Sequence, residues 1–122
     1  MTEAYILDKV SALRPNPYGS YLGDYLKSLD LRIRTELLCE NDPSYTPDKL
    51  ALDDKDFAIY ELFLFSVIDL LNGEYGRHEN SRGAFEDAYS ELLKRYAESA
   101  DDTDTSVDTK PEENYERSFR IW

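Results

Sequence analysis

The sequence of 122 residues has few of the side chains that most often build reactive sites. It contains one cysteine, Cys39, and one histidine, His78. A single cysteine cannot form an internal disulfide, and no second thiol is present with which it could build a metal site. We therefore expect Cys39 to be a buried or half-buried structural thiol. His78 lies in a polar turn without a cluster of partner groups, so we expect it to be solvent-exposed rather than a general base.

Long apolar runs are also missing. No stretch approaches the roughly 20 apolar residues that a helix needs to cross a bilayer. The first residues, Met1 to Ile6, have neither the basic start nor the long apolar centre of a signal peptide. We therefore expect no membrane partner and an intracellular origin. A chain of this length has room for one domain with a single hydrophobic core.

Positively charged side chains are scarce. Lysine and arginine number 14 against 26 aspartates and glutamates, and the formal net charge is -12. Binding to nucleic acid depends on Lys and Arg displacing the counterions of the phosphates, so this balance argues against DNA binding. It permits the opposite role, because a negative surface repels the DNA backbone and lets a duplex slide past without sticking.

Catalytic motifs are absent from the sequence. The glycines are scattered, at positions 19, 23, 73, 76 and 83, and form no phosphate-binding loop. No serine or cysteine lies in a recognisable nucleophile motif. Asp53, Asp54 and Asp56 precede a predicted helix, and capping by Asp53 or Asp54 explains them better than a cation site, which needs about six oxygen ligands. We expect no metal, no other cofactor and no enzymatic activity.

What the sequence does contain is helical periodicity. Apolar residues three and four apart mark one face of a helix. This spacing runs through residues 2–13, 20–38, 57–75 and 85–96, and it predicts a helix around each of these stretches, the first capped by Thr2. The apolar stripes consist of Ile6, Val10 and Leu13; Leu22, Leu26, Leu29, Ile33 and Leu37; Phe57, Tyr60, Leu64, Val67, Ile68, Leu71 and Tyr75; and Phe85, Tyr89, Leu92, Leu93 and Tyr96. Since no alternating strand pattern occurs, we predict an all-α fold: a small bundle of about four helices with a flexible acidic C-terminal tail.

The last two predicted helices form a hairpin that carries a motif. Its turn starts at Asn72 and Gly73, which weaken the helix, and the second helix is expected to restart from a cap at Asn80 or Ser81. The motif reads N-G-E-Y-x-R, then N-S, then F-x-x-A-Y, and its residues are Asn72, Gly73, Glu74, Tyr75, Arg77, Asn80, Ser81, Phe85 and Tyr89.

In order and spacing, this motif resembles a family of small tailed-phage proteins, the head-tail connector or adaptor proteins found under the portal of siphophage-type virions. The resemblance covers residues 53–96, with a looser match over residues 21–38. It implies an all-α structural virion protein that assembles as a ring between the portal and the tail-side neck proteins, with DNA passing through its channel without specific binding. Such a protein would be made in the host bacterial cytoplasm and act at the head-tail neck. It could be a monomer in isolation if the ring forms only on the portal.

Two sets of residues are candidates for the contacts of such a ring. Phe63 and Phe65 fall outside the main stripe of their helix, which is therefore apolar nearly all round and is expected to contact a neighbouring subunit. The second set lies in a predicted C-terminal region, residues 98–122, that follows a helical domain of residues 1–97. There an acidic linker leads to a docking peptide with the interface residues Tyr115, Arg117, Phe119, Ile121 and Trp122. In an extended conformation this peptide could add as a strand to an exposed edge of a partner.

A second function stays open: an acidic inhibitor that imitates DNA and occupies a nucleic-acid-binding enzyme. The small size, the net charge and the helical carboxylates fit this alternative. Against it, the first 97 residues contain 18 acidic and 11 basic residues, which is less one-sided than a phosphate mimic requires.

Overall fold

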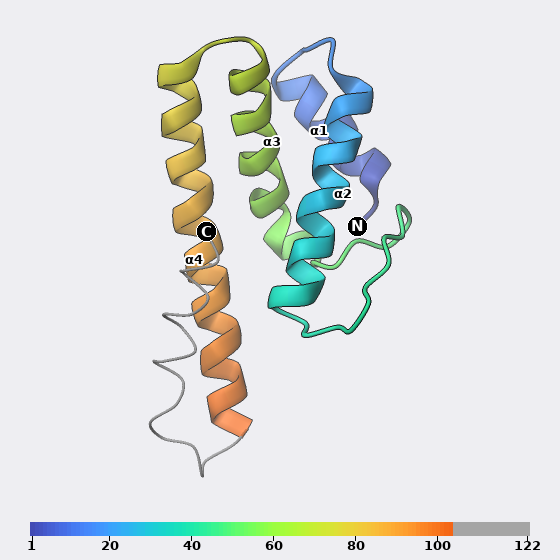
Figure 1. The fold of residues 1–122 in the computed structure, drawn as a ribbon, viewed down its shortest axis with the longest axis vertical. Helices are drawn as coiled ribbons and strands as arrows, with labels where there is room; N and C mark the ends of the chain where they lie inside the picture. Colours follow the sequence, from blue (N-terminus) through green and yellow to red (C-terminus); the bar gives the residue numbers. More distant parts are fainter. Residues whose placement is uncertain (104–122) are drawn as a thin grey trace. The chain divides into compact units, whose positions relative to one another are not determined.

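The computed structural model describes residues 1–103, and these residues form four α-helices and one short 3₁₀ helix (Figure 1). The order is α1 (Glu3–Leu13), α2 (Gly19–Glu36), η1 (Asp54–Asp56), α3 (Phe57–Leu71) and α4 (Tyr75–Thr103). Within the described part no strand occurs, which confirms the predicted all-α fold. The predicted docking peptide, with Tyr115, Arg117, Phe119, Ile121 and Trp122, lies outside the described residues.

The chain divides into two compact units, Met1–Glu86 and Asp87–Trp122. The core of the first unit lies where α1, α2 and α3 pack on one another (Figure 1). Its buried apolar residues include Ile6, Val10, Leu22, Leu26, Leu29, Ile33, Ile59, Tyr60, Leu64, Val67 and Ile68. Most of them belong to the predicted stripes, and each side chain of this size contributes about 1.5–3 kcal/mol when it is fully buried. The periodicity of the sequence therefore identified most of this core.

The predicted N-terminal cap is confirmed for α1 and is wrong for the helix that follows Asp53 and Asp54. The Thr2 side chain caps α1 and accepts a hydrogen bond from the Tyr5 amide at 3.1 Å, as predicted. The predicted capping by Asp53 or Asp54 is wrong, because neither η1 nor α3 has a side-chain cap. Instead the Asp56 amide donates to the Asp53 carbonyl at 2.9 Å, so the backbone of η1 itself leads into α3.

The turn between α3 and α4 is shorter than predicted. Gly73 has a φ of +75°, and the Gly73 and Glu74 amides donate to the Leu70 and Asp69 carbonyls at 3.0 and 2.9 Å. This is the Schellman arrangement, in which a left-handed glycine ends a helix and satisfies its last carbonyls. Helix α4 starts directly afterwards at Tyr75. The prediction of a cap at Asn80 or Ser81 is therefore wrong, since both residues lie inside α4.

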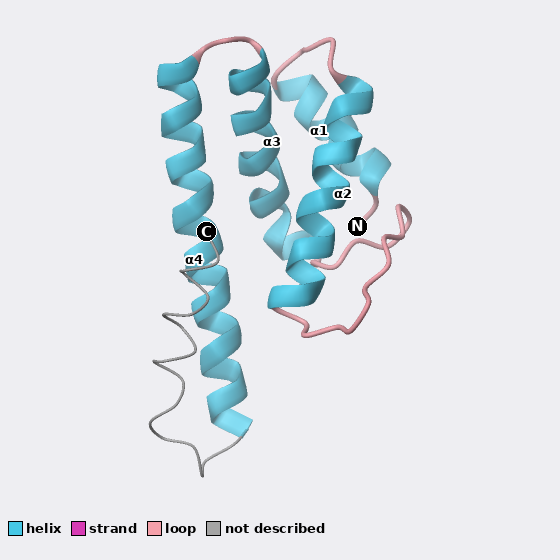
Figure 2. Ribbon diagram, viewed as in Figure 1, coloured by secondary structure: helices cyan, strands magenta, loops and turns pink. Residues whose placement is uncertain are grey.

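Residues 37–53 form the longest connection in the described part of the chain (Figure 2). The Glu3 amide donates to the Pro47 carbonyl at 2.8 Å, and the Leu50 amide donates to the Met1 carbonyl at 3.0 Å. Cys39, at the start of this loop, is exposed and has a φ of 54°. The expectation of a buried or half-buried thiol is therefore wrong, because α2 has already ended and the chain has turned out toward solvent.

Helix α4 ends at Thr103, beyond the position 97 at which the helical domain was predicted to stop. In the second unit Tyr89, Leu92 and Leu93 are buried, as their spacing predicted. The tyrosine of the F-x-x-A-Y element, Tyr89, is therefore a buried residue.

Candidate functional site

Most residues of the hairpin motif lie at one end of the first unit. The loop between α1 and α2 and the turn between α3 and α4 lie at this end (Figure 1, top). We call it the loop end. Asn72 to Glu74 form the turn, and Tyr75, Arg77, Asn80 and Ser81 belong to the first turns of α4.

A buried carboxylate holds the loop end together. Asp69, in the last turn of α3, is 1% exposed. It accepts a hydrogen bond from the Arg14 guanidinium at 2.7 Å and one from the Ser81 hydroxyl at 2.8 Å. Both of its oxygens are therefore used, one by the α1–α2 loop and the other by α4. Ser81, predicted as a helix cap, instead joins α4 to α3.

Other motif residues support the same turn. Asn72 accepts a hydrogen bond from the Tyr18 hydroxyl at 2.6 Å, which joins the start of α2 to the end of α3. Arg77 forms an exposed ion pair with Glu74 at 3.2 Å. His78 is half-buried, and its Nδ1 donates to the Ser66 carbonyl at 2.8 Å. The expectation of an exposed turn histidine is therefore wrong, because an earlier helix start places the ring against α3.

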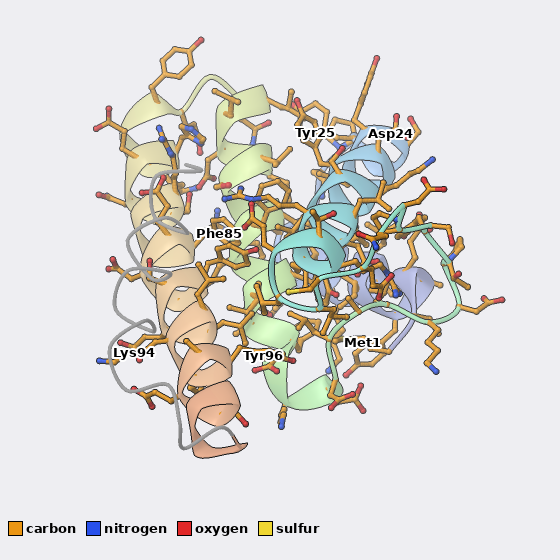
Figure 3. The ribbon with its side chains drawn as sticks, turned by 60° about the horizontal axis from the view of Figure 1, so that its bottom comes forward. Met1, Asp24, Tyr25, Phe85, Lys94 and Tyr96 are labelled. Carbon is orange, nitrogen blue, oxygen red and sulfur yellow. The ribbon has the colours of Figure 1, made fainter. Side chains whose placement is uncertain are left out.

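The two phenylalanines predicted at an interface have partners within their own chain. Phe63 packs on Phe85, with ring centroids 5.1 Å apart, and Figure 3 shows Phe85 pointing from α4 toward α3. The Arg14 guanidinium lies 4.3 Å from the ring centroid of Phe65. Both phenylalanines stay half-buried. A contact between either of them and a neighbouring subunit stays a prediction.

Exposed apolar side chains gather at the loop end instead. Tyr75 is 67% exposed, because it begins α4 rather than ending α3, so its predicted place on the apolar stripe is wrong. Leu13, also predicted on a stripe, is 61% exposed at the end of α1. We define the loop-end surface as Leu13, Tyr21, Leu70, Leu71 and Tyr75, all of which are exposed. Sequence reasoning missed it, although the apolar pair Leu70-Leu71 directly before a glycine turn was a signal.

An open pocket of about 410 Å³ lies within the loop end. It is lined by Leu13, Arg14, Pro15, Ile68, Asp69, Asn72 and Arg77. Its walls are therefore partly apolar, with two guanidinium groups and a carboxylate among them. Since Asp69 already accepts two hydrogen bonds and Arg14 already pairs with it, this arrangement resembles a structural junction more than a catalytic centre.

A second buried carboxylate holds the long loop. Asp30, fully buried on α2, accepts hydrogen bonds from the Tyr60 hydroxyl at 2.7 Å and from the Ala51 amide at 2.8 Å. It also pairs with Arg34 at 3.0 Å, and Arg34 donates onward to the Lys49 carbonyl at 2.8 Å. Burial, followed by the hydrogen bond to Asp30, raises the pKa of Tyr60 far above its usual value. Tyr60 therefore stays protonated and donates.

Residues 1–103 also lack a candidate metal site and a candidate membrane span. Among their described side chains, no group of three or more histidines, cysteines or carboxylates is placed to hold a metal ion. No helix in the same part of the chain combines the length and the apolar character that a bilayer span requires.

Comparison with protein-family models, with curated proteins and with solved structures gives no match for this chain.

Proposed function

We propose that the chain is a structural protein of a tailed-phage virion, a head-tail connector that assembles as a ring between the portal and the tail. In this role it is not an enzyme, and its partners are its own copies, the portal and the tail-side neck proteins. The motif that resembles this family supports the proposal. Its residues at the loop end make packing contacts: Ser81 bonds to a buried carboxylate, Asn72 to a tyrosine and Gly73 shapes the turn.

The observation that carries the proposal is the loop-end surface. Five large apolar side chains are exposed at one end of the first unit, next to an open pocket. A compact monomer rarely keeps apolar side chains gathered at one place unless a partner covers them. A ring needs two different complementary surfaces on each subunit, and the loop-end surface supplies a candidate for one of them.

The distribution of charge favours a connector that lets DNA pass over an inhibitor that imitates DNA. The net charge of -12 disfavours a protein that grips phosphates. A DNA mimic needs free carboxylates in an array, yet Asp30 and Asp69 are buried and paired with arginines. Glu36 and Glu86 also form ion pairs along their helices, and Glu74, in the turn before α4, pairs with Arg77. This use of acidic groups favours the connector over the inhibitor.

Electron microscopy tests the proposal. The purified chain is mixed with portal assemblies from the phage that encodes it, and the particles are averaged. We expect a ring of additional density on the tail-facing side of the portal, and virions labelled through this protein should carry the label at the neck. Absence of both would contradict the proposal. In pull-downs from infected cells, portal and tail proteins would support it, whereas capture of a nuclease or polymerase would favour the DNA mimic.

A further inference from the structure

We propose that the loop-end surface of one copy binds residues 115–122 of a second copy. This inference rests on the proposed function, because it names the self-contact by which the ring would be linked. It commits to one occupant: a segment of the same chain that lies outside the described residues.

The receiving surface is accessible and has an anchor point. Leu13, Tyr21 and Tyr75 are each more than 60% exposed, and Leu70 and Leu71 are 40% and 37% exposed. The pocket beside them offers a concave site for a single large side chain. Large apolar or aromatic anchors that fill such pockets carry most of the binding energy in protein interfaces.

The proposed occupant combines large apolar side chains with a small positive charge. Residues 115–122 contain four large apolar side chains, those of Tyr115, Phe119, Ile121 and Trp122. The segment also has two arginines against one glutamate, whereas the first 97 residues have 18 acidic and 11 basic residues. The side chains of the segment thus sum to +1 and those of the first 97 residues to -7, although the pocket itself is lined by Arg14 and Arg77.

Acidic groups are available at the surface itself. Glu74, next to Tyr75, has a side chain that is 47% exposed and pairs only with the exposed Arg77. Asp24, on α2 one turn from Tyr21, is exposed and labelled in Figure 3. An exposed pair such as Glu74–Arg77 is worth less than about 1 kcal/mol, so Glu74 can exchange partners readily. Arg117 and Arg120 would then meet a carboxylate on either side of the apolar residues.

A second copy fits this contact because it makes the association directional. Each chain has one such segment and one such surface, and they are different, so the contact is heterologous and can be repeated from copy to copy until a ring closes. Residues 104–114 connect the segment to α4. By general chain statistics, 11 residues without regular structure span about 18 Å root-mean-square.

Two full-length variants test the proposal by complementation. The surface variant carries Leu70→Asp and Tyr75→Asp, at exposed positions, and the tail variant carries Phe119→Asp and Trp122→Asp. A matched control, Leu38→Asp, changes an exposed leucine after the C-terminal end of α2. Circular dichroism checks that every variant keeps its helix content, and Ser in place of Asp gives a milder pair of variants if one does not.

Association is followed by methyl-resolved NMR and sedimentation up to millimolar concentration. We expect the wild-type chain and Leu38→Asp to associate with rising concentration, and each double variant to lose affinity about tenfold or more, because charge enters an apolar contact. Mixing the two double variants should restore one contact, giving a 1:1 pair that grows no further. The methyl signals of Leu13 and Leu71 in the tail variant should shift only when the surface variant is added.

Three results would overturn the proposal. The first is no shift of the Leu13 and Leu71 methyl signals when the two double variants are mixed at millimolar concentration, and the second is unchanged association of either double variant. The third is a difference between the methyl signals of the wild type and those of the tail variant that stays the same at every concentration. The last result would mean that the segment binds its own body. The outcome is separable from that of the proposed function. A ring on the portal without pairing of the purified variants would contradict only this self-contact, and pairing without a ring at the neck would contradict only the connector.

Discussion

Asp69 and Arg14, separated by 55 residues in the chain, meet at 2.7 Å across the loop end. The carboxylate is buried, whereas the Arg14 side chain is 31% exposed and also covers the ring of Phe65. The pair thus joins the end of α3 to the loop that follows α1, and Ser81 adds α4 to the same carboxylate.

Replacing Asp69 with Asn should destabilise the protein. Removing one partner of a buried ion pair costs about 3–5 kcal/mol, and the partial exposure of Arg14 lets water compensate for some of this. We expect Asp69→Asn to lower the free energy of unfolding by about 2 kcal/mol, measured by urea denaturation. The control is Glu86→Gln, which breaks the exposed pair with Arg82 and should cost less than about 0.5 kcal/mol. Equal losses in the two variants would show that the buried Asp69–Arg14 pair stabilises the protein no more than the exposed pair of Glu86 and Arg82 does.

The Tyr60 hydroxyl should contribute measurably to the anchoring of the long loop. It donates to Asp30 at 2.7 Å and accepts from the Leu52 amide at 3.1 Å, both in the interior. Tyr60→Phe leaves that amide without its partner, so we expect a loss of about 2 kcal/mol in urea denaturation. Tyr25→Phe, at a partly exposed position on α2, is the matched control and should change stability by less than about 0.5 kcal/mol.

Ionisation of the Tyr60 hydroxyl should lower the stability of the protein at high pH. Burial and the hydrogen bond to Asp30 raise the pKa of Tyr60, and burial and the hydrogen bond to Glu3 raise that of Tyr45. In the unfolded chain both phenols ionise near about pH 10, so their contribution is complete below that pH and is lost as the pH rises above it. The free energy of unfolding should therefore decline above about pH 10, and less steeply in Tyr60→Phe. Parallel curves for the two proteins would contradict this assignment.

Two glycines, one in the α3–α4 turn and one inside α4, should respond to alanine with opposite signs. Gly73 has a φ of +75°, which an L side chain rarely adopts, so Gly73→Ala should lower stability by about 1 kcal/mol. Gly83 lies inside α4 with open space where a Cβ would be, so Gly83→Ala should raise stability by about 0.5–1 kcal/mol. Thermal unfolding of both variants checks the pair. Stabilisation by Gly73→Ala would mean that the turn does not have this backbone.

Deletion of residues 115–122 separates folding from assembly. Since the buried residues described above all precede residue 94, we expect the shortened chain to keep its helix content and its unfolding midpoint. Its assembly with portal should weaken, because the predicted docking peptide is gone. Circular dichroism and microscopy of portal mixtures give the two readouts. Unchanged assembly would contradict the predicted docking role of residues 115–122.

Periodicity predicted the helical fold because burial of an apolar stripe dominates the energy of a small helix. Thr2 was predictable as a cap for a local reason, its side chain lying within reach of the Tyr5 amide. The burial of residues such as Leu26 and Leu64 could be predicted from their helical spacing alone. The sequence thus indicated both the number of helices and most of the core.

The loop end was less predictable, since its contacts join residues far apart in the chain. Nothing local to Asp69 indicates that Arg14 and Ser81 will meet it. The start of α4 was misplaced because Gly76 and Asn80 weaken a helix, yet tertiary contacts of His78 and Ser81 with α3 favour helix there. Once the helix starts at Tyr75, that side chain moves from the expected core to the surface.

Cys39 offers a practical handle on this molecule. It is exposed and is the only thiol in the sequence, and it follows α2 at the end opposite the α1–α2 loop. A maleimide fluorophore attached there would sit at one defined point and leave Leu70 and Tyr75 untouched. Energy transfer between donor-labelled and acceptor-labelled copies could then report how subunits come together in real time, without an added tag.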